Sequence, residues 1–471
     1  MVKIIKADFG FSKTAFDDFI KIMIPEAEGV KFSAVTKVES EEKIEIEIEG
    51  NGKKLILINK NYNEFADEQK VVMFKTGIMK IYGKNPRWGS LIGVRPTKLL
   101  IKMISKGAGY EKSEEILKEL YIVSDDKIKL LEKIVKTEIK YLNKNGVNVY
   151  IGVPYCPTRC TYCSFASYEK KGKHKAVYDE FVMKLLEEIE ITGEFSKEKG
   201  MKIESIYIGG GTPTLLSEDE LEKVLNMTVK SFEIDKLKEF TVEAGRVDTI
   251  TNEKLDILKK YGVTRISLNP QTFKSKTLEK IGRKYDWKKF EEYNQKAKKL
   301  GFIVNMDLIV GLPEENTEDI LNTLEELKKY NPDNFTVHML AIKRGSKLIE
   351  KGHTPVIIDY DIIEKKIESI AEELEMKPYY MYRQKNSIDE GENRGYSIEG
   401  KESLFNIEMI EENQNTMGIG GGAISKIIAD KEITRVINPK DPIQYVKEFG
   451  ERMKKKFDMF EGYYKRVEEI K

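Results

Sequence analysis

The stretch VNVYIGVPYCPTRCTYC, residues 147–163, joins a run of β-branched residues to a loop that contains every cysteine of the chain. Cys156, Cys160 and Cys163 have the spacing CxxxCxxC. Thiolates at these offsets on one tight loop can bind three irons of a single [4Fe–4S] cluster and leave the fourth iron open for a small molecule. Since three cysteines within eight residues do not suit a disulfide framework, the sequence predicts an iron–sulfur site here.

Two other interpretations of the cysteines stay open. They could be buried and pack as small hydrophobic side chains, although a polar loop after a strand is an unusual place for that. They could also bind structural zinc, but a closed Cys₃His site needs a histidine. The chain has only His174, His338 and His353, and none lies at a customary short spacing from the cysteines.

The composition narrows the class of protein. The chain of 471 residues has 80 Lys and Arg against 79 Asp and Glu, a net charge of +1, so no global field attracts it to nucleic acid or to an anionic membrane. No apolar run approaches the ~18 residues that span a bilayer, and the first residues lack the long apolar stretch of a signal peptide. We expect a cytoplasmic protein with two or three domains.

Downstream of residue 146, short apolar runs alternate with longer amphipathic stretches. Six strands are predicted, at 147–153, 203–210, 239–245, 263–269, 302–311 and 335–341, and helices near 176–194, 217–230, 252–261, 274–281, 287–300 and 316–330. Strands that alternate with helices indicate a parallel α/β sheet. A partial (β/α)₆ barrel fits six such units best, and a doubly wound open sheet is the alternative.

The flanking regions have different patterns. EKIEIEIEG and KKLILIN, on either side of Asn51-Gly52, predict a hairpin with a type I′ turn. Helical patterns at 113–120 and 126–142 complete an N-terminal α+β domain over 1–145, followed by the barrel over 146–376 and a C-terminal α/β extension over 377–471. In that extension GIGGGAISK lacks the register of a nucleotide-binding loop, and we expect a tight turn that lines the active site.

Several residues at predicted strand ends are candidates for ligand binding. Three glycines at 209–211 would let the backbone approach a ligand closely, although a plain turn explains them equally well. Asp307 lies inside a very apolar strand, where an acid needs a buried partner or a ligand.

CxxxCxYC, with Tyr162 at the aromatic position, resembles the signature of the radical S-adenosylmethionine (SAM) superfamily. YIGVPYCPTRCTYCSF, GGGTPT, NPQTF, IGRKY and NMDLIVGLP together resemble the oxygen-independent coproporphyrinogen III oxidases. WGSLIGVRPTK, TVHMLAIKRGS, PYYMYRQKN and NTMGIGGGAISK are most similar to the HemZ-type coproporphyrinogen dehydrogenases of that group. The resemblance covers most of the chain and implies a radical SAM partial barrel.

The resemblance also implies the cofactor ligands. Cys156, Cys160 and Cys163 would hold the [4Fe–4S] cluster, and SAM would bind its open iron and be cleaved to a 5′-deoxyadenosyl radical. The implied SAM contacts are Tyr150, Tyr162, Gly210, Gly211, Thr212, Glu243, Gln271, Arg283, Asp307 and Ala341. One position departs from the pattern: well-known members have Tyr-x-His-x-Pro before the first cysteine, whereas this chain has Gly152 in place of the histidine.

The implied reaction is the oxidative decarboxylation of two propionates of coproporphyrinogen III to vinyl groups, which yields protoporphyrinogen IX for haem biosynthesis. A haem-binding chaperone of the same group and another radical SAM enzyme acting on tetrapyrroles are the alternatives. The implied partners are the tetrapyrrole and an electron donor such as flavodoxin or ferredoxin. A substrate with four carboxylates needs cations, and the candidates are Arg95, Lys98, Arg383 and Lys385.

Overall fold

The computed structural model of the protein describes residues 3–62, 64–65, 69–93, 95–342, 346–350, 357–384, 391–429 and 432–470. Its contacts divide the chain into two compact units. Unit 1 comprises Met1–Lys140 with Met381–Asn386, and unit 2 comprises Tyr141–Tyr380 with Ser387–Lys471. Most of region 377–471 thus belongs to the same unit as the barrel, because its strands pair with the barrel strands.

Unit 1 is built on a four-stranded sheet in the order β1-β2-β3-β4. The predicted hairpin is confirmed, since β3 and β4 pair antiparallel and the turn residues Asn51 and Gly52 have φ of 50° and 69°. One hydrophobic core joins this sheet to the helices. The elements are β1 (Lys3–Ala7), β2 (Lys31–Glu39), β3 (Lys43–Gly50), β4 (Lys53–Lys60), α1 (Lys13–Met23), α2 (Gln69–Ile81), α3 (Pro96–Ser105), α4 (Gly109–Glu119) and α5 (Asp125–Glu138).

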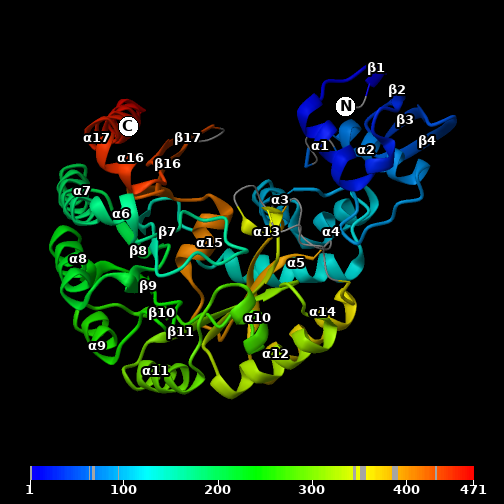
Figure 1. Ribbon diagram of the computed structural model, residues 1–471. Coiled ribbons are helices and arrows are strands. Elements are labelled where there is room, and N and C mark those ends of the chain that lie inside the picture. Colours follow the sequence, from blue (N-terminus) through cyan, green and yellow to red (C-terminus); the bar gives the residue numbers. More distant parts are fainter. Residues whose placement is uncertain are drawn as a thin grey trace. The chain divides into compact units, whose positions relative to one another are not determined.

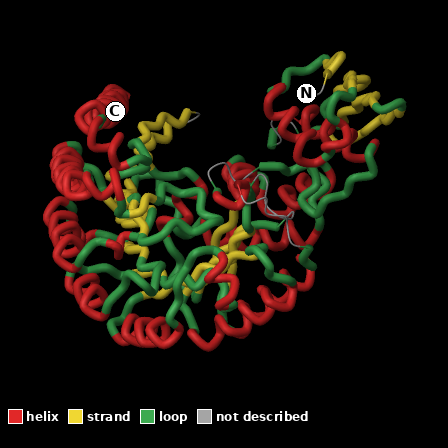
Figure 2. The backbone as a smooth tube through the Cα atoms, in the orientation of Figure 1, coloured by secondary structure: helices red, strands yellow, loops and turns green. Residues whose placement is uncertain are grey.

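Six parallel strands of unit 2 form the partial barrel, and each is paired with the next along the chain. The order never reverses, so the prediction of a partial barrel is confirmed and the doubly wound alternative is wrong. Figure 1 and Figure 2 show the helices outside these strands. The strands are β5 (Val147–Val153), β8 (Ile203–Gly210), β9 (Glu239–Glu243), β10 (Arg265–Ser267), β11 (Ile303–Val310) and β12 (Asn334–Met339).

The barrel helices begin at clear sequence signals. Ser217 and Glu220 form a capping box at the start of α8, and Asn316 and Asp319 do the same for α12. The predicted helices are confirmed. The helices of this region are α6 (Gly172–Ala176), α7 (Tyr178–Glu198), α8 (Glu218–Ser231), α9 (Asn252–Lys260), α10 (Ser275–Lys280), α11 (Trp287–Lys299), α12 (Thr317–Tyr330), α13 (Lys347–Glu350) and α14 (Tyr360–Glu373), and two short paired strands are β6 (Tyr155–Cys156) and β7 (Tyr168–Glu169).

The C-terminal region extends the barrel sheet on both sides to eleven strands, in the order β13-β14-β12-β11-β10-β9-β8-β5-β15-β16-β17. β15 is parallel to β5, although more than 250 residues separate the two strands. Among the described residues, no helix has the length and apolar character that a bilayer crossing requires. The elements are β13 (Lys377–Tyr382), β14 (Asn393–Ser397), α15 (Leu404–Glu411), β15 (Asn415–Gly420), β16 (Ile424–Ala429), β17 (Glu432–Ile437), α16 (Pro442–Lys447) and α17 (Phe449–Ile470).

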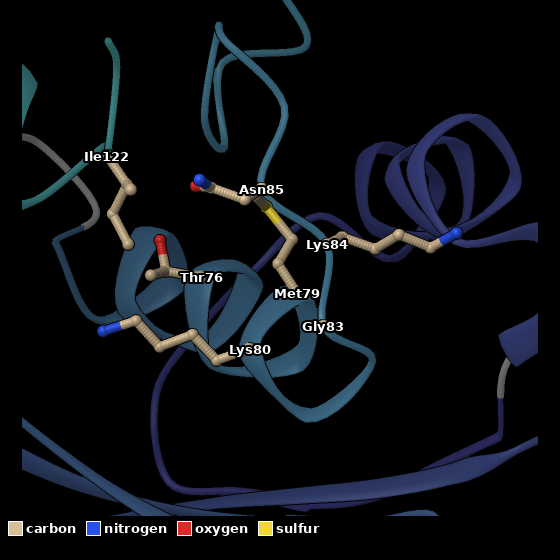
Figure 3. Close-up of a pocket in the computed structure, with 7 residues that line it drawn as sticks. All are labelled: Thr76, Met79, Lys80, Gly83, Lys84, Asn85 and Ile122. Carbon is tan, nitrogen blue, oxygen red and sulfur yellow. The ribbon is translucent and has the colours of Figure 1, made fainter.

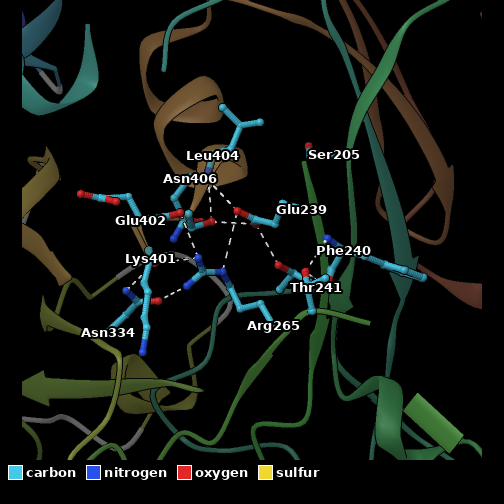
Figure 4. A network of polar contacts seen from close by, with 12 residues as sticks. Ser205, Glu239, Phe240, Thr241, Arg265, Asn334, Lys401, Glu402, Leu404 and Asn406 are labelled. Atoms are coloured by element: carbon cyan, nitrogen blue, oxygen red, sulfur yellow. Dashed lines mark hydrogen bonds and ion pairs between the residues drawn. The ribbon is translucent and has the colours of Figure 1, made fainter. Parts of the chain in front are cut away.

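A buried polar network closes the N-terminal ends of the barrel strands and anchors α15 (Figure 4). Glu239, the first residue of β9, accepts hydrogen bonds from the Ser403 hydroxyl at 2.9 Å and from the Leu404 N–H at 2.7 Å. Arg265, the first residue of β10, donates to the carbonyls of 401–402 at 2.7 and 2.9 Å. Both charged side chains are only 5% exposed, so the network holds the start of α15 firmly at this end of the barrel.

Candidate active site

The C-terminal ends of the six barrel strands lie along one edge of the sheet, because neighbouring strands run in the same direction. Barrel enzymes place their sites at this edge. Most of the residues predicted to contact SAM lie at this edge or just beyond it: Tyr162 in the segment after β5, Gly210, Gly211 and Thr212 at the end of β8, Glu243 at the end of β9, Gln271 and Arg283 after β10, and Ala341 after β12. Tyr150 and Asp307 lie inside β5 and β11.

Three free cysteines lie in the segment that follows β5, Cys156 in the short strand β6 and the other two in the loop after it. Cys156 and Cys160 are buried, and the Thr212 hydroxyl donates to Cys156 Sγ at 3.3 Å. Burial, with the nearby charges of Cys160 and Cys156, raises the pKa of Cys163 to about 11, so the sulfurs are close enough to interact. Binding to iron would remove this penalty, because metal-bound thiols lose their protons. The donor set therefore fits a cluster.

The histidines do not complete a zinc site with these cysteines in the part of the chain that is described. His174 faces Asp441, with 3.5 Å between Nε2 and Oδ1, and His338 faces Asp307 at 3.8 Å. His353 lies outside the described residues. No three His, Cys, Asp or Glu side chains of the described residues are gathered as one metal ion requires, whereas a cluster binds each thiolate at a different iron.

The glycines at the end of β8 allow the strand to approach the cysteine loop. Gly211 N–H donates to the Val153 carbonyl at 2.8 Å, and Thr212 N–H donates to the Tyr155 carbonyl at 2.8 Å. A Cβ on Gly211 would lie 2.6 Å from the Tyr155 oxygen, and Gly210 has a φ of 111°. A side chain at either position would push the loop away, which explains the glycines without a ligand.

Glu243 connects the ends of β8 and β9. Its carboxylate accepts hydrogen bonds from the Tyr207 hydroxyl at 2.7 Å and from Gly210 N–H at 3.2 Å. Burial raises the pKa of Glu243 to about 7, the charge of Asp307 adds to the rise, and the two hydrogen bonds oppose it. Glu243 is therefore close to half-protonated near neutral pH.

Asp307, in contrast to Glu243, is held in its ionised state. Asn269 and Asn305 donate from their side-chain amides to its two carboxylate oxygens, both at 2.8 Å. Burial alone would raise the pKa of Asp307, but the hydrogen bond and charge of His338, with the Asn305 amide, outweigh it and hold the pKa below its usual value. One partly buried acid of the site thus stays ionised beside another that is partly neutral, a pattern typical of functional sites.

Gln271 is positioned for a ligand that donates hydrogen bonds. Its φ is 68°, and its N–H donates to the Asp307 carbonyl at 2.9 Å, while its own carbonyl accepts from Ile309 N–H at 2.8 Å. Its buried Oε1 has no hydrogen-bond partner among the described residues. A buried orphan acceptor is costly, and a ribose hydroxyl would satisfy it. The site therefore fits SAM at this position.

Arg283 supports the cysteine loop from the side of β10. It is buried, and it donates to the Tyr162 hydroxyl at 3.3 Å and to the carbonyls of Gly245 and Asn269 at 2.5 and 2.9 Å. The contact with Tyr162 fixes the residue next to Cys163. Its role towards SAM stays a prediction, as does that of Ala341.

The sequence did not indicate four residues that pack around the predicted site, one of which, Phe405, lies at the start of α15. Arg246 contacts Cys160, Asn269 holds Asp307, and Tyr207 bonds Glu243. Phe405 of α15 stacks on Tyr207 with 4.4 Å between ring centroids. Asn269, Arg246 and Tyr207 lie in or just after predicted strands, a signal that could have found them. The sequence around Phe405 does not indicate where this residue lies in the fold.

The absence of the family histidine at position 152 has a structural cause. β15 lies beside β5, and Gly421 N–H donates to the Gly152 carbonyl at 3.0 Å. A Cβ on Gly152 would lie 2.7 Å from the Gly421 oxygen. The predicted tight turn is confirmed, with φ of 83° at Gly420 and 74° at Gly422, and its backbone leaves no space for a side chain at 152.

Restoring the histidine should therefore damage the protein. We expect Gly152→His to lower the free energy of unfolding by roughly 3 kcal/mol, since overpacking against backbone cannot be relieved by a rotamer change. Thermal or urea unfolding would measure this loss. Gly450→His in α17 is the matched control, because no atom of the described part of the chain lies within 4 Å of a Cβ at Gly450. A Gly152→His protein as stable as the control would contradict the contact with Gly421.

The residues predicted to bind substrate carboxylates are in unit 1. Arg95 precedes α3 and Lys98 lies in its first turn. Arg383 places its guanidinium 5.2 Å from the centroid of the Trp88 ring and donates to the Leu91 carbonyl. Lys385 lies outside the described residues. Their role in substrate binding stays a prediction.

A cavity of about 280 Å³ lies at the end of α2 in unit 1 (Figure 3). Thr76, Met79, Lys80 and Lys84 are among the residues that line it. The Lys84 ammonium pairs with Glu26 at 2.7 Å. None of the predicted site residues that the structure describes lines this cavity.

Comparison with known proteins agrees with the site. The family model of the radical SAM superfamily matches residues 150–327. The oxygen-independent coproporphyrinogen-III oxidase-like protein HemZ of Bacillus subtilis (strain 168) is 40% identical over 380 residues, which cover 78% of this chain and 75% of that protein. The chain belongs to the HemZ-like family of radical SAM proteins. Membership of the radical SAM superfamily implies SAM and a [4Fe–4S] cluster, which agrees with the cluster predicted from the cysteine spacing and with the SAM implied by the resemblance.

Other relatives of this HemZ-like protein are named heme chaperones. The heme chaperone HemW of Bacillus subtilis (strain 168) is 30% identical over 282 residues, which cover 59% of this chain and 70% of HemW. Among solved structures, coproporphyrinogen III oxidase (HemN) from Escherichia coli has a TM-score of 0.51 at 20% identity, covering 67% of this chain and 72% of HemN. That structure supports the fold.

The raised pKa of Glu243 predicts a pH dependence of stability. The native state holds this proton more tightly than the unfolded chain, whose pKa is near 4.5, so the stabilisation is complete below about pH 4.5 and is lost as the pH rises through 7. In Glu243→Gln, the free energy of unfolding should fall by about 3 kcal/mol less than in the wild type as the pH rises over this range. Urea unfolding at pH 5 and pH 8 would measure it.

Glu315, which accepts from the Thr272 hydroxyl, provides a parallel case among residues not predicted to contact SAM. Burial raises the pKa of Glu315 to about 7 as well. Glu315→Gln should therefore also reduce the change in the free energy of unfolding between pH 5 and pH 8. A Glu243→Gln protein with the pH slope of the wild type would show that Glu243 is not protonated in the native state.

Proposed function

We propose that this HemZ-like protein catalyses the oxygen-independent oxidative decarboxylation of coproporphyrinogen III to protoporphyrinogen IX. The observation that carries the proposal is the convergence of the three-cysteine loop with Glu243, Gln271 and Asp307 at one edge of the barrel, in a chain that is 40% identical to HemZ. When bound, the cluster and SAM supply one-electron chemistry strong enough to remove a hydrogen atom from an unactivated carbon.

The residues have separate tasks in this proposal. Cys156, Cys160 and Cys163 hold the cluster, and Arg283 and Thr212 keep its loop in place. Gln271 and Asp307 accept hydrogen bonds from the hydroxyl groups of SAM. Each propionate of the substrate loses one hydrogen atom from its β-carbon, one CO₂ and one electron, and the product is a vinyl group. A one-electron carrier such as flavodoxin or ferredoxin delivers the reducing electrons, and a separate acceptor takes up those released.

A haem chaperone is the second candidate, favoured by the 30% identity to HemW. Both candidates need a tetrapyrrole ligand, so binding alone does not separate them. Decarboxylation does, because a chaperone releases its ligand unchanged.

Mass spectrometry of the products tests the proposal. The protein is reconstituted anaerobically with iron and sulfide and incubated with SAM, dithionite and coproporphyrinogen III. We expect the loss of two carboxyl groups together with the formation of 5′-deoxyadenosine. Stable haem binding with no decarboxylation would favour the chaperone, and transfer of a labelled methyl group from SAM to the tetrapyrrole would indicate a methylating enzyme instead.

A further inference from the structure

Arg246 is a buried cation beside the cysteine loop, and the proposed chemistry has not given it a role. It follows β9, and only 6% of its surface is exposed. Its Nη1 lies 3.7 Å from Cys160 Sγ and donates to it. The same nitrogen donates to the Thr158 carbonyl at 3.1 Å and to the Thr158 hydroxyl at 3.0 Å.

Asp248 orients this guanidinium. Its two carboxylate oxygens accept from Nε at 2.9 Å and from Nη2 at 2.7 Å, a two-point contact that fixes the plane of the group. Nη1 is the nitrogen that remains, and it points at the loop. Asp248 is 27% exposed on its side chain, so it is partly hydrated, whereas the guanidinium is not.

A cation that donates to a ligand sulfur has a known effect on an iron–sulfur cluster. Reduction adds one negative charge, and donors to the sulfurs stabilise that charge and raise the reduction potential. The effect is strong where water is excluded. At Cys160 the donor is both charged and buried, so it acts on the electron affinity of the cluster as well as on the shape of the loop.

We propose that Arg246 is a positioning residue that raises the reduction potential of the cluster through its N–H donation to Cys160 Sγ, with Asp248 moderating its charge. The inference rests on the proposed cluster. The electron comes from an external one-electron reductant and takes the cluster from the 2+ to the 1+ state. Arg246 thus makes the cluster easier to reduce.

A redox titration with dithionite, followed by electron paramagnetic resonance of the reconstituted full-length protein, tests the inference. In Arg246→Gln the ratio of reduced to oxidised cluster at a given potential should fall about tenfold, which for a one-electron couple is a decrease of about 59 mV. Asp248→Asn should shift the potential the opposite way, because it removes the counter-charge and leaves Arg246 in place.

Thr158→Val is the matched control for a purely structural role. It removes the Thr158 hydroxyl contacts to Arg246 and to the Gly282 carbonyl, but no charge near the sulfur. We expect its potential to match the wild type. Equal potentials in wild type, Arg246→Gln and Asp248→Asn, at equal iron content, would overturn the inference. If Arg246→Gln does not fold, Asp248→Asn alone decides it. A wild-type protein that takes up no iron would instead overturn the proposed function.

Discussion

Replacing Cys160 by Ala is expected to abolish cluster binding and with it all decarboxylation. Cys160 is the central cysteine of the loop, it is 8% exposed, and Arg246 donates to its sulfur. A cluster held by two thiolates has lost a ligand to one iron, and no histidine is placed to replace it among the described residues. Iron analysis should fall from roughly four irons per wild-type chain towards none, and 5′-deoxyadenosine should drop to the level of a protein-free control.

The cysteine is small and its replacement leaves little space, so the fold should survive. A melting temperature of Cys160→Ala close to that of the apo wild type would show this. Glu315→Gln, which changes neither the cysteines nor the side chains that donate to them, is a control that should keep its iron. Cys160→Ala protein that binds iron and forms 5′-deoxyadenosine as the wild type does would refute the assignment of the three cysteines.

Replacing Lys456 by Met is expected to be the most damaging substitution for stability. Lys456 in α17 and Glu188 in α7 are each 1% exposed and form an ion pair at 2.8 Å. Lys456 also donates to the Thr192 hydroxyl at 2.9 Å. Removing the ammonium leaves a buried carboxylate without its counter-charge, which costs about 3–5 kcal/mol. Urea unfolding should show this loss.

The double variant Glu188→Leu with Lys456→Met separates the interaction energy of the ion pair from the cost of leaving one charge buried alone. Two apolar side chains should recover part of the stability, because no charge is then left buried alone. The recovery is incomplete, because Gly420 N–H, the Asn438 amide and the Tyr445 hydroxyl lose Glu188 as their acceptor. A double variant as unstable as the sum of the single variants would contradict this account.

The ion pair also bears on the active site. Glu188 accepts from Gly420 N–H at 2.7 Å, and Lys456 donates to the Gly418 carbonyl at 3.3 Å. Both glycines belong to β15, whose following residue Gly421 packs against Gly152 at the end of β5. The C-terminal helix therefore helps to place the backbone that fills the position of the family histidine.

The sequence by itself determined the parts of this protein that depend on local pattern. Runs of β-branched residues separated by amphipathic helices predicted the six barrel strands, and the cysteine spacing predicted the cluster loop. Both patterns depend on residues that are close together in the sequence. The acids were also detectable: Asp307 stood out because a carboxylate in an apolar strand needs partners, and the structure supplies Asn269 and Asn305.

Only the tertiary structure decided the features that join distant segments. The pairing of β15 with β5, the place of α15 inside the barrel and the contact of Arg246 with Cys160 each bring together residues that are 86 or more positions apart. No local signal encodes such a contact, since the energy comes from the burial of both partners at once. Gly152 shows the difference: the sequence displayed a missing histidine, and the fold showed that the Gly421 backbone occupies its space.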